Sequence, residues 1–331
     1  MTHAGLPFDD IRALVRMMPG PDEEALATVA EREATLIKAP GSLGNLETLA
    51  AWAAGWQGRA MPSTHRPLVA MFAASHAIAG RMAAADAAMT TRRLVEAYAA
   101  GGGAINQVCA AYDFGLKVFD LALDLPTPDF TGADALDEAG CAATMAFGME
   151  CIAGGADLLC VAALGQGGSV SAAAIACALH GGEAGDWVAP GDDGAAALVS
   201  AALAHHRGRL ADPLEVLRRL GGRDIAAVAG AILAGRLQRI PVILDGYATA
   251  AAAAVLHALD SSALDHCVAG HAAGPAHAAL LARLGLQPLL RLDIASPEGV
   301  GASLACGILK AAIACHNDMA TRQQAGWLAD A

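Results

Sequence analysis

The stretch Leu289–Ala314, LLRLDIASPEGVGASLACGILKAAIA, combines a short apolar run, a glycine-rich turn and an apolar helical pattern in direct succession. Leu289–Ile294 predicts a short buried strand, and Ser303–Ala314 has its apolar residues at helical spacing. Open α/β sheets bind ligands where a strand, a glycine-rich turn and a helix follow one another, at the carboxyl ends of the strands. The stretch therefore predicts an α/β fold with a ligand-binding loop.

Glu298 is the one carboxylate between these two elements. Gly299 and Gly301 follow it and relax the backbone, so a substrate could approach the loop closely. One interpretation is a helix-start carboxylate that satisfies free N–H groups and the positive end of the helix dipole. The other is a general base in a ligand cleft, and this stretch alone leaves both interpretations open.

Apolar bursts alternate with helical segments along most of the chain, which predicts a parallel sheet. The other predicted strands are Leu68–Ala74, Leu116–Leu123, Leu158–Ala163 and Pro241–Asp245, with a further fragment in CVAGH. The predicted helices between them include Val95–Tyr112, Gly221–Leu237 and Ala248–Leu259. Met1–Pro62 has a helical pattern and is distinct from the alternating segments after it.

Composition and charge narrow the functional class. The 331 residues carry a net charge of −12 with no basic tract, which argues against nucleic acid or an anionic membrane as a partner. No uninterrupted apolar run reaches the roughly 18 residues of a membrane span. The N-terminal residues lack the basic and apolar regions of a secretion signal. We therefore expect a cytoplasmic protein.

The cysteines and histidines do not form a metal-binding pattern. Eight cysteines are scattered without a Cys-x-x-Cys, so they are expected to pack in the core as small apolar side chains. His271 and His277 lie in one loop region, but no third ligand is visible, and loop or capping roles are the simpler interpretation. No metal site is predicted.

Several loops follow the predicted strands and could meet a ligand. Gly165, Gly167, Gly168 and Ser169 could present free N–H groups to a phosphate, although a tight strand-to-helix turn explains them equally well. Asp245 ends a strand, where ligand binding and helix capping are equally plausible. The glycine- and aspartate-rich loop 180–194 suggests the rim of a site. Lys38 stands beside a turn, which is either a simple connection or an anion contact.

Taken together, several separated pieces resemble the nicotinate-nucleotide:dimethylbenzimidazole phosphoribosyltransferases of the lower-ligand branch of cobalamin synthesis. The pieces are Lys38-Ala-Pro-Gly-Ser-Leu-Gly44, Gly102-Gly-Ala-Ile-Asn106, the helix opening Gly221–Gly230, Pro241-Val-Ile-Leu-Asp-Gly246, and Pro288-Leu-Leu-Arg-Leu-Asp293 leading to Glu298-Gly-Val-Gly-Ala302. Each is weak alone, but the ordered set spans nearly the whole chain and is specific.

The resemblance implies a doubly wound, mainly parallel α/β domain over residues 66–311 and a small helical domain from residues 1–65 and about 312–331. It also implies a homodimer, with Glu298 at the family's catalytic glutamate. The substrate-binding positions that we predict are His76, Gly102, Gly103, Asn106, Gly165, Gly167, Gly168, Ser169, Asp245, Gly246, Gly299 and Gly301.

The implied reaction needs a general base, and Glu298 is the candidate for this role. A benzimidazole nitrogen attacks the ribose anomeric carbon of nicotinate mononucleotide, and nicotinate leaves as its ring nitrogen gives up its positive charge. The leaving group needs no proton, but the attacking base must lose the proton on its other nitrogen, so one carboxylate can suffice as general base. The reaction requires no metal or redox cofactor.

The chain departs from the family pattern in its ligand loops. Ala163-Leu-Gly-Gln-Gly-Gly-Ser-Val170 replaces an acid, Met and Gly-Ile-Gly-Asn-Thr-Thr, and Ser75-His-Ala-Ile78 replaces Asp-His-Gly-Val. Gly274 stands where the family has an acid before a proline, and the helix segment 194–203 lacks an expected lysine. Two alternatives therefore stay open, a transferase with an altered substrate and a non-catalytic family member that binds a base or a nucleotide.

Overall fold

The structure, a computed structural model, describes residues 6–82, 90–295 and 298–327 and is built on one six-stranded sheet. The strands are β1 Pro67–Ala73, β2 Gly115–Asp120, β3 Leu158–Leu164, β4 Val242–Asp245, β5 Cys267–His271 and β6 Pro288–Leu290. All neighbouring pairs are parallel, in the order β2-β1-β3-β4-β5-β6. The central strands β1, β3 and β4 are buried along their whole length, which is why they consist of continuous apolar runs.

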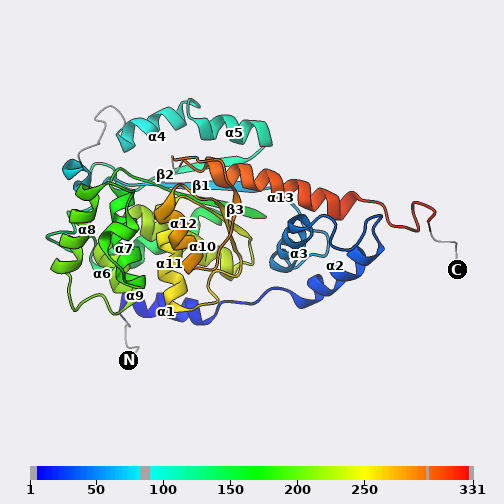
Figure 1. Cartoon of the computed structure of the whole chain (residues 1–331), viewed down its shortest axis with the longest axis horizontal. Coiled ribbons are helices and arrows are strands. Elements are labelled where there is room, and N and C mark those ends of the chain that lie inside the picture. The colour runs from blue at the N-terminus through cyan, green and yellow to red at the C-terminus, as the bar shows by residue number, and fades with distance from the viewer. Residues whose placement is uncertain (1–5, 83–89, 296–297, 328–331) are drawn as a thin grey trace.

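Helices cover both faces of the sheet (Figure 1). The α-helices are α1 Pro7–Arg16, α2 Glu23–Thr35, α3 Asn45–Gln57, α4 Thr91–Ala99, α5 Ala104–Tyr112, α6 Glu138–Met149, α7 Gly168–His180, α8 Asp193–His205, α9 Pro213–Leu220, α10 Arg223–Leu237, α11 Tyr247–Leu259, α12 Pro275–Arg283 and α13 Val300–Asp318. Three short 3₁₀ helices are η1 Ala77–Arg81, η2 Glu150–Ile152 and η3 Ala184–Trp187. Figure 1 shows α4, α5 and α13 on one face and α6 to α12 on the other.

The strand order reverses between β1 and β3, so the predicted doubly wound α/β fold is confirmed. Ala73, at the end of β1, pairs with Asp120 of β2 on one side and with Leu164 of β3 on the other. The connection after β1 runs over one face through α4 and α5, and the connection after β3 runs over the other through α7 to α10. A crevice therefore opens at the carboxyl ends of these strands, where such sheets bind ligands.

The predicted helix Val95–Tyr112 is two helices in the structure. α4 and α5 are separated at residues 100–103, where Gly101 has a positive φ of 77°. The Gly102 N–H donates to the Ala97 carbonyl and closes α4. Three consecutive glycines favour this turn over a continuous helix because glycine adopts the left-handed conformation without steric cost.

The predicted strand Leu289–Ile294 is wrong beyond Leu290. β6 covers only Pro288–Leu290, and its pairings join Ala269 to Pro288 and His271 to Leu290. β6 lies at the sheet edge, so it has one neighbour strand, and that neighbour ends at His271. Beyond this point the apolar residues have no strand to pair with, and Leu292 is 52% exposed.

The helices α2 and α3 and the last turns of α13 form a small helical unit beside the sheet (Figure 1). An antiparallel bridge between Leu36 and Thr321 ties the two chain ends together. Lys38 lies within this unit with its Nζ 2.8 Å from Glu33 and 3.0 Å from Glu47, so its charge is neutralised by protein carboxylates. By contrast, α1 packs against α6 and α10 and lies with the large domain rather than with α2 and α3.

α13 is the one helix in the described parts of the chain that is long and apolar enough to cross a membrane. It instead packs along β4, β5 and α3, with Ala302, Cys306 and Leu309 buried. Its apolar character is therefore explained by its position on the sheet. Seven of the eight cysteines are buried and all are free thiols, which confirms their predicted role in core packing.

Candidate active site

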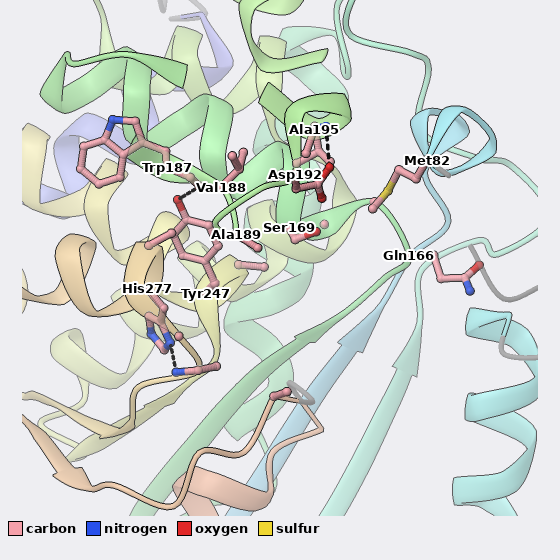
Figure 2. A pocket seen from close by; sticks show the side chains of 18 of the residues that line it. Met82, Gln166, Ser169, Trp187, Val188, Ala189, Asp192, Ala195, Tyr247 and His277 are labelled. Carbon is pink, nitrogen blue, oxygen red and sulfur yellow. Dashed lines mark hydrogen bonds between the residues drawn. The ribbon is translucent and has the colours of Figure 1, made fainter. Parts of the chain in front are cut away.

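A cavity of about 440 Å³ lies at the carboxyl ends of β3, β4 and β5 (Figure 2). Its wall comes from the segments that follow these strands and from the loop before α8. The lining residues are Ala79, Met82, Ala163, Gly165, Gln166, Gly167, Gly168, Ser169, Val170, Trp187, Val188, Ala189, Asp192, Ala195, Tyr247, Ala248, Ala273, Gly274, Pro275, Ala276, His277 and Ala295. Part of the glycine- and aspartate-rich loop 180–194 thus forms the rim that the sequence predicted.

Four helices begin at this cavity. Ser169, Ala195, Tyr247 and Pro275 belong to the first turns of α7, α8, α11 and α12, respectively, and all four line the wall. The first N–H groups of a helix have no partner within the helix, and the helix dipole places partial positive charge there. The described wall contains no lysine or arginine, so the helix N-termini are its source of positive potential for an anion.

The turn Gly165–Gly168 requires glycine because it passes close to buried groups. A Cβ at Gly165 would lie 2.8 Å from the Ala74 carbonyl oxygen and 2.8 Å from Asp224 Oδ2. Gly167 has a φ of 92° and is the N-cap residue of α7. The turn is closed by its own hydrogen bonds, because the Gly168 N–H donates to the Gly165 carbonyl and the Val170 N–H donates to the Gly167 carbonyl.

His76 does not line the cavity but lies directly beneath this turn. Its Nε2 is 3.0 Å from both carboxylate oxygens of Asp224, and both side chains are essentially fully buried. Asp224 lies in the first turn of α10, so the pair connects the end of β1 to that helix. The structure thus places His76 as a support of the glycine turn.

Tyr247 and His277 form the aromatic end of the cavity (Figure 2). The Tyr247 hydroxyl donates to the Trp187 carbonyl over 2.9 Å. The Ala273 N–H donates to His277 Nδ1 over 2.9 Å, so the proton of the neutral imidazole is on Nε2. Burial, together with the nearby His271, lowers the pKa of His277 to about 4.

This pKa makes stability depend on pH below neutrality. The unfolded chain binds a proton at His277 near its ordinary value of 6.5, whereas the folded chain resists protonation until about pH 4. Acidification through this range therefore favours unfolding, by at most about 3 kcal/mol for this group. We expect His277→Asn, whose amide oxygen can accept the same N–H, to lose less stability than the wild type between pH 7 and pH 5. Urea unfolding at each pH tests this, and parallel pH profiles for the two proteins would contradict it.

Glu298 immediately precedes Gly299, the N-cap residue of α13, and it is partly exposed. Gly299 has a φ of 76°, and a Cβ there would lie 3.3 Å from the Val69 side chain and 3.4 Å from that of Ile105. Burial, and then the neighbouring Glu298 carboxylate, raise the pKa of the Tyr98 phenol. Glu298 therefore interacts with Tyr98 of α4 and is not among the residues that line the cavity, which its loop borders at Ala295.

Asp245 is fully buried and contacts protein groups. Its Oδ1 accepts the Ala302 N–H of α13 over 3.0 Å and lies 3.0 Å from His271 Nδ1. Gly301 packs against both side chains, because a Cβ there would lie 2.0 Å from His271 Nδ1 and 2.6 Å from Asp245 Oδ1. Gly246 begins α11 with a φ of 86°. Direct substrate contact by these residues stays a prediction.

Gly102 and Gly103 lie between α4 and α5, Asn106 lies in the first turn of α5, and none of the three lines the cavity wall. Asn106 accepts the Gly103 N–H over 3.0 Å and donates to the Tyr98 carbonyl over 2.9 Å. These bonds close the turn above Tyr98, which lies beside Glu298. The structure therefore gives this motif a supporting position near the Glu298 loop.

Sequence patterns did not single out three lining residues, namely Trp187, Asp192 and Tyr247. Tyr247 directly follows Pro241–Gly246, so its place after a strand end is a usable signal. Trp187 and Asp192 come from the predicted rim loop, in which no local pattern distinguishes one residue from another. The interpretation of His277 as a loop or capping residue agrees with its hydrogen bond to Ala273.

Comparison with known proteins places these features in a family. A model described as phosphoribosyltransferase matches residues 18–327. The chain belongs to this phosphoribosyltransferase family. A nicotinate-nucleotide–dimethylbenzimidazole phosphoribosyltransferase from Agrobacterium fabrum is 55% identical over 98% of the chain and 97% of its own length. One from Rhizobium meliloti is 54% identical over 98% of each chain.

A solved structure extends this likeness to three dimensions. The crystal structure of the nicotinate-nucleotide–dimethylbenzimidazole phosphoribosyltransferase of Thermus thermophilus matches with a TM-score of 0.83 and 34% identity. The match covers 93% of this phosphoribosyltransferase and 100% of the solved chain. Most of the architecture is therefore shared with an enzyme of the family.

Proposed function

We propose that this protein transfers the ribose phosphate of nicotinate mononucleotide to a benzimidazole-type base, releasing nicotinate and an α-ribazole phosphate. The main support for this proposal is the cavity, whose wall includes the first turns of four helices. The loop that bears Glu298 borders this cavity at Ala295. The relatives that are 55% identical over nearly the full chain are named for this reaction. We expect the enzyme to act in cobalamin lower-ligand synthesis.

The phosphate of the nucleotide binds among the helix N-termini in this proposal. The N-termini of α7 and α12 lie at the cavity wall, at Ser169 and Pro275, and the positive ends of their helix dipoles favour an anion there. Ala163 and Gly274 line the wall where the family typically has acids, so phosphate recognition here depends on backbone groups. Asp192 is the one acid in the described wall, and its carboxylate already accepts the Ala195 N–H over 2.9 Å.

Glu298 then acts as the general base. The attacking nitrogen of the aromatic base forms the new bond to the anomeric carbon while the bond to nicotinate breaks and its electron pair returns to the nicotinate ring. Glu298 takes the proton from the other ring nitrogen of the attacking base, which keeps the product neutral at that ring. For this geometry the aromatic base lies between the cavity and α4, next to Tyr98.

Nicotinate release tests the proposal. The purified protein is incubated with nicotinate mononucleotide and a panel of benzimidazoles and purines, and nicotinate and the new nucleotide are quantified together. We expect release that depends on the added base. Tight binding of the nucleotide without product would instead identify a non-catalytic family member, and it would contradict the proposed transfer.

A negative charge at Ser169 tests the phosphate site separately. Ser169 is an exposed residue in the first turn of α7 and lines the cavity. An aspartate there is compatible with the helix dipole, so we expect Ser169→Asp to keep the stability of the wild type. It should weaken nucleotide binding by about tenfold or more, because like charges a few ångströms apart repel. Ser169→Ala is the matched control, and calorimetric titration with nicotinate mononucleotide measures both. Equal affinity in the two variants would place the phosphate elsewhere.

We also propose that the enzyme is a cytoplasmic homodimer whose partners are its small-molecule substrates. The family resemblance supports the dimer, and the net charge of −12 without a basic tract supports the absence of nucleic-acid or membrane partners. Sedimentation analysis at micromolar concentration tests the oligomeric state, and a monomer would contradict the proposal.

A further inference from the structure

Asp245 and His271 form a buried ion pair that the proposed reaction does not use directly. They occupy the last positions of the neighbouring strands β4 and β5, and His271 Nδ1 lies 3.0 Å from Asp245 Oδ1. Both side chains are 0% exposed. A charged pair at this depth is costly to bury, so its remaining contacts indicate what it does.

Those contacts are made with residues that precede and follow Glu298 in the sequence. The Ile294 carbonyl oxygen, four residues before Glu298, is 3.0 Å from His271 Nε2. The Ala302 N–H, four residues after it, donates to Asp245 Oδ1 over 3.0 Å. One ion pair thus holds the chain at both ends of the loop that bears the proposed base.

Both ring nitrogens of His271 lie close to oxygen atoms of the protein. His271 Nε2 is 3.0 Å from the Ile294 carbonyl oxygen in a hydrogen bond, and its Nδ1 is 3.0 Å from Asp245 Oδ1 in an electrostatic contact. Burial alone would lower the pKa of His271, but the bond and charge of Asp245 and the Ile294 carbonyl outweigh this effect and raise it.

The close fit of Gly301 completes the arrangement. A side chain at this position would overlap both members of the pair, with its Cβ 2.0 Å from His271 Nδ1. The first turn of α13 can therefore lie directly on the pair only because residue 301 is glycine. The pair thus contacts the start of α13, the helix that follows Glu298.

We propose that Asp245 and His271 are positioning residues that fix the Glu298 segment, meaning residues 294, 295 and 298–302. This inference rests on the proposed function, because it assigns the pair the task of holding the general base in place. Neither residue touches the reacting atoms in this arrangement. A misplacement of about 1 Å in a reacting group can lower a rate by on the order of 100-fold.

The experiment compares two substitutions at His271. His271→Gln keeps an N–H that can donate to the Ile294 carbonyl, whereas His271→Leu has a similar volume and no donor. We expect the leucine variant to lose on the order of 100-fold in kcat, with the KM for nicotinate mononucleotide changed by less than about threefold. The glutamine variant should retain kcat within about fivefold of the wild type. Equal losses in both variants, or wild-type kcat in the leucine variant, would overturn the proposal.

His266 provides the matched control. It precedes β5, is fully buried, and places its Nε2 2.9 Å from the Ile232 carbonyl oxygen, far from Glu298 in the fold. His266→Leu removes a buried histidine–carbonyl bond without touching the Glu298 segment, so we expect kcat near the wild-type value for the folded protein. If His266→Leu loses as much kcat as His271→Leu, the loss reflects the removal of a buried histidine in general, and the positioning role of His271 is contradicted.

Hydrogen exchange of the peptide covering residues 291–302 separates the two proposals. In His271→Leu this peptide should exchange faster than in the wild type, and in His271→Gln it should not, whether or not the enzyme turns over. If wild-type protein releases no nicotinate, the proposed function fails while the exchange result still decides the positioning role. Should His271→Leu not fold, the double variant Asp245→Asn/His271→Leu, which removes both charges, takes its place.

Discussion

Glu298→Gln is expected to lower kcat for nicotinate release by roughly 10²–10⁴-fold, the range that a positioned general base contributes. Glutamine has nearly the same size as glutamate and keeps a hydrogen-bonding group beside Tyr98, but it cannot take a proton from the attacking base. The KM for nicotinate mononucleotide should change little, because the proposed phosphate contacts come from the helix N-termini around Ser169 and Pro275. Steady-state rates with saturating base measure both quantities.

Glu150→Gln is the matched control for this substitution. Glu150 is an exposed residue after α6 and lies outside the cavity wall, so the same chemical change there should leave kcat unchanged. Turnover by Glu298→Gln within threefold of the wild type would remove Glu298 from the reaction. A large rise in KM with an unchanged kcat would instead assign it to substrate binding.

Gly230→Ala is expected to destabilise the protein by about 3 kcal/mol or more. Gly230 lies in α10 where that helix crosses α6, and a Cβ there would lie 1.9 Å from the Met145 carbonyl oxygen. The contact is reciprocal, because a Cβ at Gly148 of α6 would lie 1.9 Å from the Ala227 carbonyl oxygen. Both obstacles are backbone atoms, so relief requires the two helices to move apart.

The sign of this effect separates packing from helix propensity. Alanine in place of glycine normally stabilises a helix by about 0.5–1 kcal/mol. Gly194→Ala in α8 provides that comparison, since Gly194 is exposed and a Cβ there would meet only Asp192 Oδ1 at 3.6 Å. Urea unfolding should show a lower midpoint for Gly230→Ala and an equal or higher one for Gly194→Ala. A stable Gly230→Ala protein would contradict the close crossing of α6 and α10.

Local sequence patterns were sufficient to predict the strands and helices of the framework and one wall of the cavity. Leu158–Ala163 and the glycines that come after it predict a strand and a turn at a helix start, and the structure has both at the cavity. These elements depend on apolar spacing and on glycine conformations over a few neighbouring residues. The resemblance in separated motifs extends this to the family, which full-length relatives confirm.

The same local rules failed where a residue's partner is distant in the chain. Leu289–Ile294 has the composition of a strand, but β5 offers pairing only as far as Leu290. At residues 100–103 the glycines end a helix that apolar spacing alone predicts to continue. The missing strand partner decided the first outcome, and the conformational freedom of the glycines decided the second.

The sequence by itself determined the parallel α/β framework, the glycine turn after β3 and the family. Only the tertiary structure decided that Tyr247 and His277 share a cavity with Ser169, and that Asp245 holds the N–H of Ala302 rather than capping its own helix. Turn and strand preferences act between near neighbours, whereas the order of strands in the sheet brings together residues far apart in sequence. The strands β4 and β5 lie side by side, and this adjacency joins Asp245 to His271 and the pair to the Glu298 segment.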